Sequence, residues 1–215
     1  MTRIILTRHG HVEGIVPPRF RGRRDVPLTE TGRKQAAMLA EHIAARYAPA
    51  AIYTSPLSRC VATGAFIEAE TKVPASVLDG LIDFDYGDWT GKTHEEVAEA
   101  DPAGYARWWT EPQLVQPLNG DSLSGFVARV TQALLEVLAR HEGQCVVLVG
   151  HDSTNRALLL TLMDLPFSAY WRFEQSPCGI SEIDVPDNNA NGGSNRRARG
   201  LCVNETLHLE RRGIV

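Results

Sequence analysis

The stretch Arg3-Ile4-Ile5-Leu6-Thr7-Arg8-His9-Gly10-His11 determines how the rest of the chain is interpreted. It contains a short apolar run, rich in β-branched residues and followed by a glycine, which predicts a buried strand rather than a helix. Arg8 and His9 therefore follow the carboxyl end of a buried strand, the edge of an open α/β sheet where ligands bind. Gly10 would let a ligand approach the backbone closely. Taken alone, the stretch favours a basic strand end exposed to solvent, so its interpretation as a site rests on the rest of the chain.

A second buried strand has the same kind of ending. Cys145-Val146-Val147-Leu148-Val149 is uniformly apolar and stops at Gly150-His151-Asp152-Ser153, after which a helix is expected from about 154 to 163. Strands and helices alternate along the chain, which predicts an α/β fold: a three-layer αβα sandwich with a mainly parallel central sheet. Because the carboxyl ends of parallel strands share one edge of a sheet, the two imidazoles could meet there.

The other elements are expected from hydrophobic periodicity, capping residues and turn residues. In chain order they are a helix capped by Thr29 and reaching 46, a strand at 51–54, a helix starting at Ser55-Pro56, a strand at 77–78, a helical excursion from the core near 83–120, a helix capped by Ser122 or Ser124 and reaching 141, strands at 180–185 and 201–209, and a loop at 186–198.

Composition is that of an ordinary globular protein. The 215 residues, 43% of them hydrophobic and 22% charged, suit one domain over 1–215. The net charge of −4 argues against nucleic acid as a partner. No apolar stretch approaches the roughly 20 residues of a membrane span, so no membrane partner is expected. The four cysteines are far apart and form no CxxC pair, which predicts reduced thiols in a cytoplasmic protein. A homodimer is left open.

Arginines at two further places suggest an anionic ligand. The loop Arg19-Phe20-Arg21-Gly22-Arg23-Arg24 is interpreted either as a solvated loop or as a mouth that attracts anions. Arg59, in the first turn of its helix, opposes the helix dipole and destabilises the helix unless an anion is bound nearby. With two imidazoles and a carboxylate, such arginines suit phosphoryl transfer. An imidazole attacks phosphorus, arginines neutralise the phosphoryl oxygens, and a carboxylic acid protonates the leaving oxygen.

Seven short motifs follow one another along nearly the whole chain. They are Arg8-His9-Gly10, Asp25-x-Pro27-Leu28-Thr29, Tyr53-Thr54-Ser55-Pro56-Leu57-x-Arg59, Gly87-Asp88-Trp89-x-Gly91, Gly120-Asp121-Ser122, Val149-Gly150-His151 and Asn204-Glu205-Thr206-x-His208. In this order they resemble the motifs of the histidine phosphatase (phosphoglycerate mutase-like) superfamily. The resemblance implies that His9 is the nucleophile, that Arg8, Arg59 and His151 hold the phosphoryl group, and that Asp83 is the general acid and base. It implies neither a metal ion nor a cofactor.

Departures from the family pattern refine the expected reaction. Asp83 stands where Glu is usual and is one methylene shorter with the same chemistry; Asp85 is the alternative for this role. Ile15 and Arg21 stand where mutases have a phosphate-binding Asn and a small residue, and the long insert with paired arginines of a cofactor-dependent mutase is absent. We therefore expect a metal-independent phosphomonoesterase that acts on small phosphorylated metabolites through a phosphohistidine on His9, rather than a cofactor-dependent phosphoglycerate mutase.

Two alternatives come from other classes of protein. His9-x-His11 also resembles the metal pair of amidohydrolases, although that fold is a (β/α)₈ barrel of about 250 residues and Arg8 would repel a dication. The other alternative is a catalytically silent module that binds phosphorylated ligands. For the substrate-binding end of the site we expect Arg21, which would select a second anionic group, and Tyr86, which would add a hydroxyl contact. The remaining expected substrate-binding residues are Gly22, Asp152 and Ser153.

Overall fold

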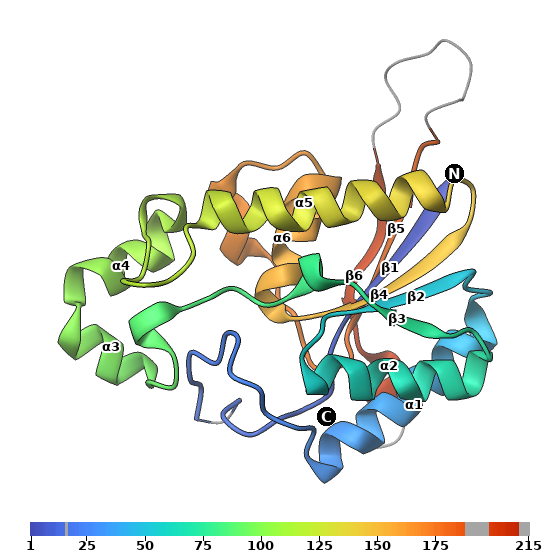
Figure 1. Cartoon of the computed structure of the whole chain (residues 1–215), viewed down its shortest axis with the longest axis horizontal. Helices are drawn as coiled ribbons and strands as arrows, with labels where there is room; N and C mark the ends of the chain where they lie inside the picture. The colour runs from blue at the N-terminus through green and yellow to red at the C-terminus, as the bar shows by residue number, and fades with distance from the viewer. Residues whose placement is uncertain (16, 188–197, 211–215) are drawn as a thin grey trace.

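The computed structural model describes residues 1–15, 17–187 and 198–210. Its centre is a six-stranded sheet in the order β3-β2-β4-β1-β5-β6 (Figure 1). β1, β4, β2 and β3 run parallel to one another, whereas β5 is antiparallel to β1 and β6 is antiparallel to β5. The expected mainly parallel sheet is therefore confirmed, with two antiparallel strands at one side. The strands are β1 (Thr2–Arg8), β2 (Ala51–Thr54), β3 (Ala75–Val77), β4 (Cys145–Gly150), β5 (Ile180–Val185) and β6 (Arg199–Glu205).

Helices cover both faces of the sheet, as expected for a three-layer sandwich (Figure 1). Successive side chains of a strand point to opposite faces, and β1 follows this rule. Ile4 and Leu6 pack into the core shared with α5 and α6, whereas Ile5 packs into the core shared with α1 and α2. β1 is thus buried on both faces, which explains its uninterrupted apolar run. The helices are α1 (Glu30–Arg46), α2 (Ser58–Thr71), α5 (Leu123–Arg140) and α6 (Asp152–Leu162), with the short α7 (Leu207–Glu210) against α1.

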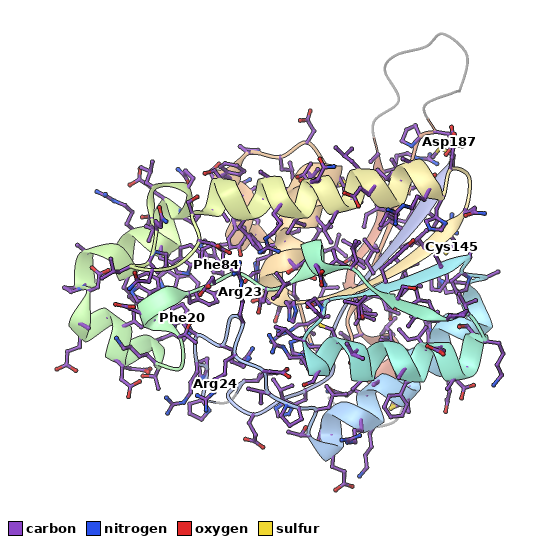
Figure 2. All side chains as sticks on the ribbon, viewed as in Figure 1. Phe20, Arg23, Arg24, Phe84, Cys145 and Asp187 are labelled. Atoms are coloured by element: carbon purple, nitrogen blue, oxygen red, sulfur yellow. The ribbon has the colours of Figure 1, made fainter. Side chains whose placement is uncertain are left out.

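The expected excursion near 83–120 holds α3 (His94–Ala100) and α4 (Pro102–Thr110), which lie beyond one end of the sheet (Figure 1). Thr93 and Glu96 form the capping box at the start of α3. Trp108 is fully buried and anchors α4 to the core, whereas the neighbouring Trp109 stays 42% exposed. Phe20 and Phe84, labelled in Figure 2, each have their ring centroid 4.9 Å from that of Tyr86. Short 3-10 turns complete this part: η1 (Asp79–Leu81), η2 (Gly87–Trp89), η3 (Pro112–Leu114) and η4 (Phe167–Arg172).

Two helix caps are confirmed, and two segment boundaries are corrected. Thr29 accepts from the backbone of Gly32 and caps α1, and Ser122, rather than Ser124, caps α5. The helix expected to start at Ser55-Pro56 begins at Ser58 instead, with Leu57 at the cap position, and the Ser55 hydroxyl lies 2.7 Å from His151 Nε2. The strand expected over 201–209 ends at Glu205 and is followed by α7. Asn204, one residue before the end of the strand, has a φ of 54°, in the left-handed region.

Gly10 has a different role from the one expected. A Cβ at this position would collide with the backbone carbonyl of Gly32, so the glycine permits close packing of two backbone segments rather than the approach of a ligand. Of the loop expected at 186–198, the ten positions 188–197 lie outside the described residues. No helix in the described part of the chain combines the length and apolar character needed to cross a membrane.

Candidate active site

The two expected imidazoles meet at the carboxyl edge of the sheet. β1 and β4 are parallel neighbours in which Arg8 pairs with Gly150, so the residues that follow, His9 and His151, lie side by side. The backbone N–H of His9 extends the ladder by donating to the Gly150 carbonyl at 3.0 Å. The two ring centroids are 5.3 Å apart at an interplanar angle of 64°.

The His9 ring is prepared for nucleophilic attack. Its Nδ1 lies 2.7 Å from the Gly10 carbonyl oxygen, which can only accept, so Nδ1 carries the proton and Nε2 keeps its lone pair. Burial lowers the pKa of His9 well below its ordinary value, and the charges of His151, Arg59 and Arg8 lower it further. His9 is therefore neutral at physiological pH with a free basic nitrogen.

Arg8 combines a strong positive charge with a donor that no protein group uses. One terminal nitrogen donates to the Gln175 carbonyl at 2.6 Å, which fixes the side chain. Its Nε is buried and has no hydrogen-bond partner among the described residues. A buried donor without a partner destabilises a protein by about 1–3 kcal/mol, and more for a charged group, so this guanidinium is suited to an anion beside His9.

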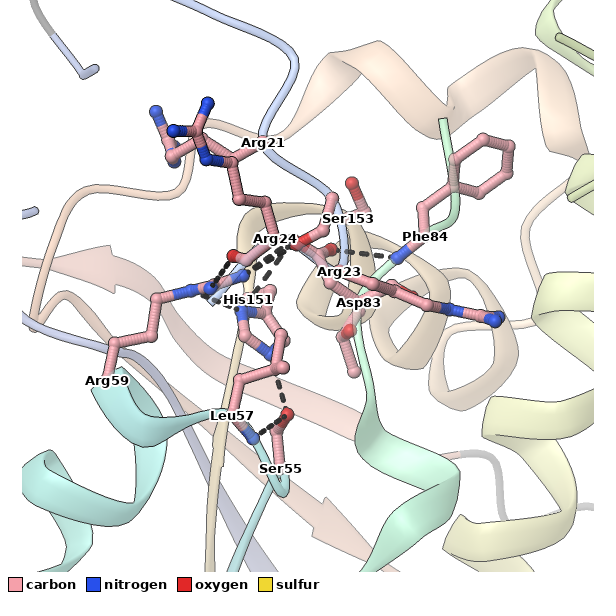
Figure 3. A network of polar contacts seen from close by, with 12 residues as sticks. Arg21, Arg23, Arg24, Ser55, Leu57, Arg59, Asp83, Phe84, His151 and Ser153 are labelled. Atoms are coloured by element: carbon pink, nitrogen blue, oxygen red, sulfur yellow. Dashed lines mark hydrogen bonds and ion pairs between the residues drawn. The ribbon is translucent and has the colours of Figure 1, made fainter. Parts of the chain in front are cut away.

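Arg59 is completely buried at the start of α2 and links several parts of the site (Figure 3). Its Nε donates to His151 Nδ1 at 3.3 Å, and its terminal nitrogens donate to the carbonyls of Arg24 and Gly22, each at 2.8 Å. His151 Nδ1 thus acts as an acceptor, and Nε2 donates to Ser55 Oγ at 2.7 Å. Burial, followed by the charges of Arg59 and Arg8, lowers the pKa of His151 well below its ordinary value.

Asp83, rather than Asp85, lies with this group (Figure 3). Asp83 Oδ2 is 3.3 Å from an Arg59 terminal nitrogen and 3.7 Å from His151 Nδ1, and Oδ1 accepts from the Phe84 N–H at 2.9 Å. Burial raises the pKa of Asp83, an effect that the positive charge of Arg59 only partly opposes. Asp85 points elsewhere, accepting from the Gly87 N–H at 2.9 Å and pairing with Arg23 at 3.4 Å.

A pair of arginines fixes the backbone of Asp83. Arg129 on α5 donates to the carbonyls of Gly80 at 2.9 Å and Ile82 at 2.8 Å, and reaches that of Asp83 at 3.3 Å. Arg23 donates to the same Asp83 carbonyl at 3.3 Å. Asp121 joins the two arginines, at 2.9 Å from Arg23 and 3.5 Å from Arg129. We call Arg23, Asp121 and Arg129 the Asp83 clamp.

A cavity of about 630 Å³ opens over the catalytic group. Arg8, His9 and Asp83 form its inner wall, whereas Arg59 and His151 are buried behind that wall. The cavity is within the range of about 300–1,000 Å³ that small-molecule sites occupy. All the residues expected at the substrate-binding end line it: Arg21, Gly22, Tyr86, Asp152 and Ser153.

The substrate-binding residues also hold one another in place. The Tyr86 hydroxyl and Ser153 Oγ are 3.0 Å apart, and Arg156 binds Asp152 Oδ1 at 2.8 Å. Arg21 donates to the Gly14 carbonyl. Burial and the charge of Arg8 lower the pKa of Arg21 to about 10, so it remains cationic at neutral pH. In the arginine loop, Arg19 and Arg21 face the cavity, whereas Arg23 belongs to the Asp83 clamp.

Several residues around the site were not found from the sequence. Ser55 was interpreted only as a helix cap, although its position after a strand in the same motif as Arg59 could have marked it. Arg129 carried no signal, because its role depends on packing against a segment distant in sequence. Asp121 was noticed only as part of the Gly120-Asp121-Ser122 motif, without a role. Much of the outer cavity wall likewise carried no signal in the sequence. The wall residues that were not expected are Pro18, His94, Trp108, Trp109, Arg156, Trp171, Arg172, Phe173 and Glu174.

Comparison with known proteins places this arrangement in a family. The family model "Histidine phosphatase superfamily (branch 1)" matches residues 4–192. The chain belongs to the histidine phosphatase superfamily. The expected family is confirmed, and so is the expected enzyme class, a phosphatase, at the level of the family.

Named relatives of this superfamily cover most of the chain. Phosphoserine phosphatase 1 of Hydrogenobacter thermophilus is 34% identical over 209 residues, covering 97% of this chain and 95% of that protein. The adenosylcobalamin/alpha-ribazole phosphatase of Salmonella typhimurium is 30% identical over 184 residues, covering 85% of this chain and 90% of that protein. The structure of Bacillus stearothermophilus YhfR is 28% identical with a TM-score of 0.87, covering 97% of this chain and 100% of that chain.

The fold also bears on the amidohydrolase alternative. That alternative required a closed (β/α)₈ barrel, whereas the sheet here is open and carries two antiparallel strands. His11 does not join His9 in lining the cavity: its Nδ1 is 3.0 Å from Thr29 Oγ1, and its N–H donates to Gln35 at 2.9 Å. The pairing of His9 with His11 is therefore wrong, and His9 lies with His151 instead.

Proposed function

We propose that this chain is a phosphomonoesterase that acts on small phosphorylated metabolites through a phosphohistidine on His9, with Asp83 as general acid and base. One observation carries the proposal. His9, whose Nε2 keeps its lone pair, and Arg8, whose buried Nε–H has no partner among the described residues, line the same cavity. A phosphoryl group would give the arginine its acceptor and bring phosphorus to the imidazole.

The first half of the reaction forms the covalent intermediate. His9 Nε2 attacks phosphorus, the bond between phosphorus and the ester oxygen breaks, and its electron pair leaves with that oxygen. Asp83 is suited to give this oxygen a proton, because burial raises its pKa and favours the protonated carboxyl. Arg8 stabilises the charge on the phosphoryl oxygens, and Arg59 and His151 support it from behind the cavity wall.

The second half regenerates the enzyme. A water molecule attacks the phosphohistidine, the ionised Asp83 accepts the proton of that water, and the bond between phosphorus and Nε2 breaks. The water oxygen becomes part of the inorganic phosphate that leaves, and His9 returns to its neutral form. The hydrogen bond from His9 Nδ1–H to the Gly10 carbonyl favours this cycle, because it stabilises the positive charge that develops on the ring during attack.

We further propose that Arg21 selects substrates with a second anionic group. Its guanidinium is held in the cavity wall by Gly14, and a charge-assisted hydrogen bond from it is worth about 1.5–3 kcal/mol. The phosphoserine named for one relative carries such a group.

A single domain over 1–215 and a cytoplasmic location, supported by free thiols at all four cysteines, complete the proposal. The homodimer stays a prediction.

The stereochemistry at phosphorus tests the covalent route. A phosphomonoester made chiral with three oxygen isotopes should be transferred to an acceptor alcohol with retention, because two successive in-line displacements each invert the phosphorus. A single displacement without an enzyme intermediate would give inversion and refute the proposal.

His9→Gln should abolish turnover of p-nitrophenyl phosphate. The matched His141→Gln variant, at the opposite end of β4, should keep it.

A further inference from the structure

The cavity continues from the catalytic group to a wall of aromatic rings. Phe20 and His94 have centroids 4.5 Å apart, His94 and Trp109 5.7 Å, and Trp109 and Trp171 4.5 Å. These four side chains come from three separate parts of the chain: the arginine loop, the excursion and η4. All of them line the cavity. We call Phe20, His94, Trp109 and Trp171 the aromatic wall.

Packing of the protein core does not account for the outer part of this wall. Trp108 is fully buried and fills the core, but Trp109, the next residue, is 42% exposed and faces the cavity. Trp171 is held in position rather than left free. Its Nε1 donates to the Trp108 carbonyl at 2.7 Å, and the Arg156 guanidinium lies 5.0 Å from its ring centroid. The two indoles therefore form a pre-positioned apolar surface that meets solvent.

We propose that the aromatic wall is a subsite for a planar ring in the body of the substrate, so that a phosphomonoester that bears such a ring is preferred to the corresponding ester without it. This inference rests on the proposed phosphatase function and adds the substrate class. The cavity volume supports it, because 630 Å³ suits a ligand much larger than phosphoserine. The subsite is also continuous with the catalytic group, so one molecule can occupy both. Aromatic stacking and ring burial together give a selectivity of about tenfold.

Two esters of primary alcohols separate ring recognition from leaving-group chemistry: adenosine 5′-monophosphate and ribose 5-phosphate. The wild-type enzyme should show a kcat/KM for the nucleotide about tenfold above that for ribose 5-phosphate, which lacks the base. Trp109→Ala and Trp171→Ala should bring the ratio of nucleotide to ribose phosphate close to one, chiefly by raising the KM of the nucleotide.

The experiment distinguishes a failure of the aromatic subsite from a failure of the proposed phosphatase function. The ratio is measured within each variant, so a partly unfolded sample does not change it. Leu114→Ala removes an exposed apolar side chain that does not line the cavity and should leave the ratio as in the wild type. A wild-type ratio of nucleotide to ribose phosphate close to one, or an unchanged ratio in both tryptophan variants, would overturn the subsite. Turnover that survives His9→Gln would instead refute the proposed function and leave the ratio interpretable.

Discussion

Replacing Arg129 by methionine should weaken both the fold and the general acid, because it removes the donors of the Asp83 clamp and keeps most of the apolar stem. Arg129 makes two short bonds, to Gly80 at 2.9 Å and Ile82 at 2.8 Å, and a longer one to Asp83 at 3.3 Å. Its side chain is 28% exposed, so we take the lower end of the range for charged donors, about 1.5 kcal/mol for each short bond. The free energy of unfolding should therefore fall by about 3 kcal/mol.

Thermal unfolding and a comparison of leaving groups measure the two effects. A loss of about 3 kcal/mol in a chain of this size lowers Tm by roughly 6–12 °C. Displacing a catalytic group by about 1 Å can reduce the rate about 100-fold. Below Tm, kcat for an alkyl phosphate should fall by about that factor, and kcat for p-nitrophenyl phosphate should fall much less because its leaving group hardly needs a proton.

The control for this variant lies on the same helix. Arg140→Met removes an exposed arginine whose one ion pair within the described part of the chain is with Glu136, at 3.8 Å, and should change neither Tm nor kcat appreciably. Equal losses of kcat for both esters in Arg129→Met would show that the clamp does not act through the acid. A Tm within about 2 °C of the wild type would refute the stability estimate.

Three further predictions follow from the site. Asp83→Asn should lower kcat for alkyl phosphates about 10²–10⁴-fold and for p-nitrophenyl phosphate less; equal losses would argue against an acid. Burial raises the pKa of Asp83, so its stabilising contribution is complete below the unfolded pKa and is lost as pH rises through the folded pKa. Asp83→Asn should therefore raise Tm at pH 7.5, with the difference vanishing near pH 4, as thermal scans at both values would show. Arg21→Ala should raise KM about tenfold for substrates with a second anion. An equal rise for p-nitrophenyl phosphate would mean that Arg21 binds the transferring phosphoryl group.

The inner part of the site could be predicted because it depends on rules that act along the sequence. β1 and β4 are short apolar runs, and their parallel pairing brings His9 and His151 to one edge. Arg59 was predicted from its unfavourable place in the first turn of a helix, and the structure buries it beside Asp83. The sequence favoured Asp83 as the acid and kept Asp85 as the alternative, and the structure places Asp83 rather than Asp85 beside Arg59 and His151.

The outer part of the site could not be predicted because it depends on contacts between distant segments. The aromatic wall joins Phe20 to Trp171 through the excursion, and a tryptophan in a sequence usually indicates core packing, as it does for Trp108. The clamp joins Arg23 to Arg129 across Asp121 without any local pattern. Gly10 gave a misleading signal for a similar reason, since its neighbour Gly32 lies in another element.

Rapid-quench labelling tests the central claim most directly. The enzyme is mixed with a ³²P-labelled phosphomonoester, quenched in alkali within milliseconds, digested and mapped by mass spectrometry. The account predicts alkali-stable, acid-labile phosphate on the peptide that contains His9, formed at least as fast as the steady-state turnover and absent in His9→Gln. Label on any other residue, or an intermediate that forms more slowly than product, would contradict it.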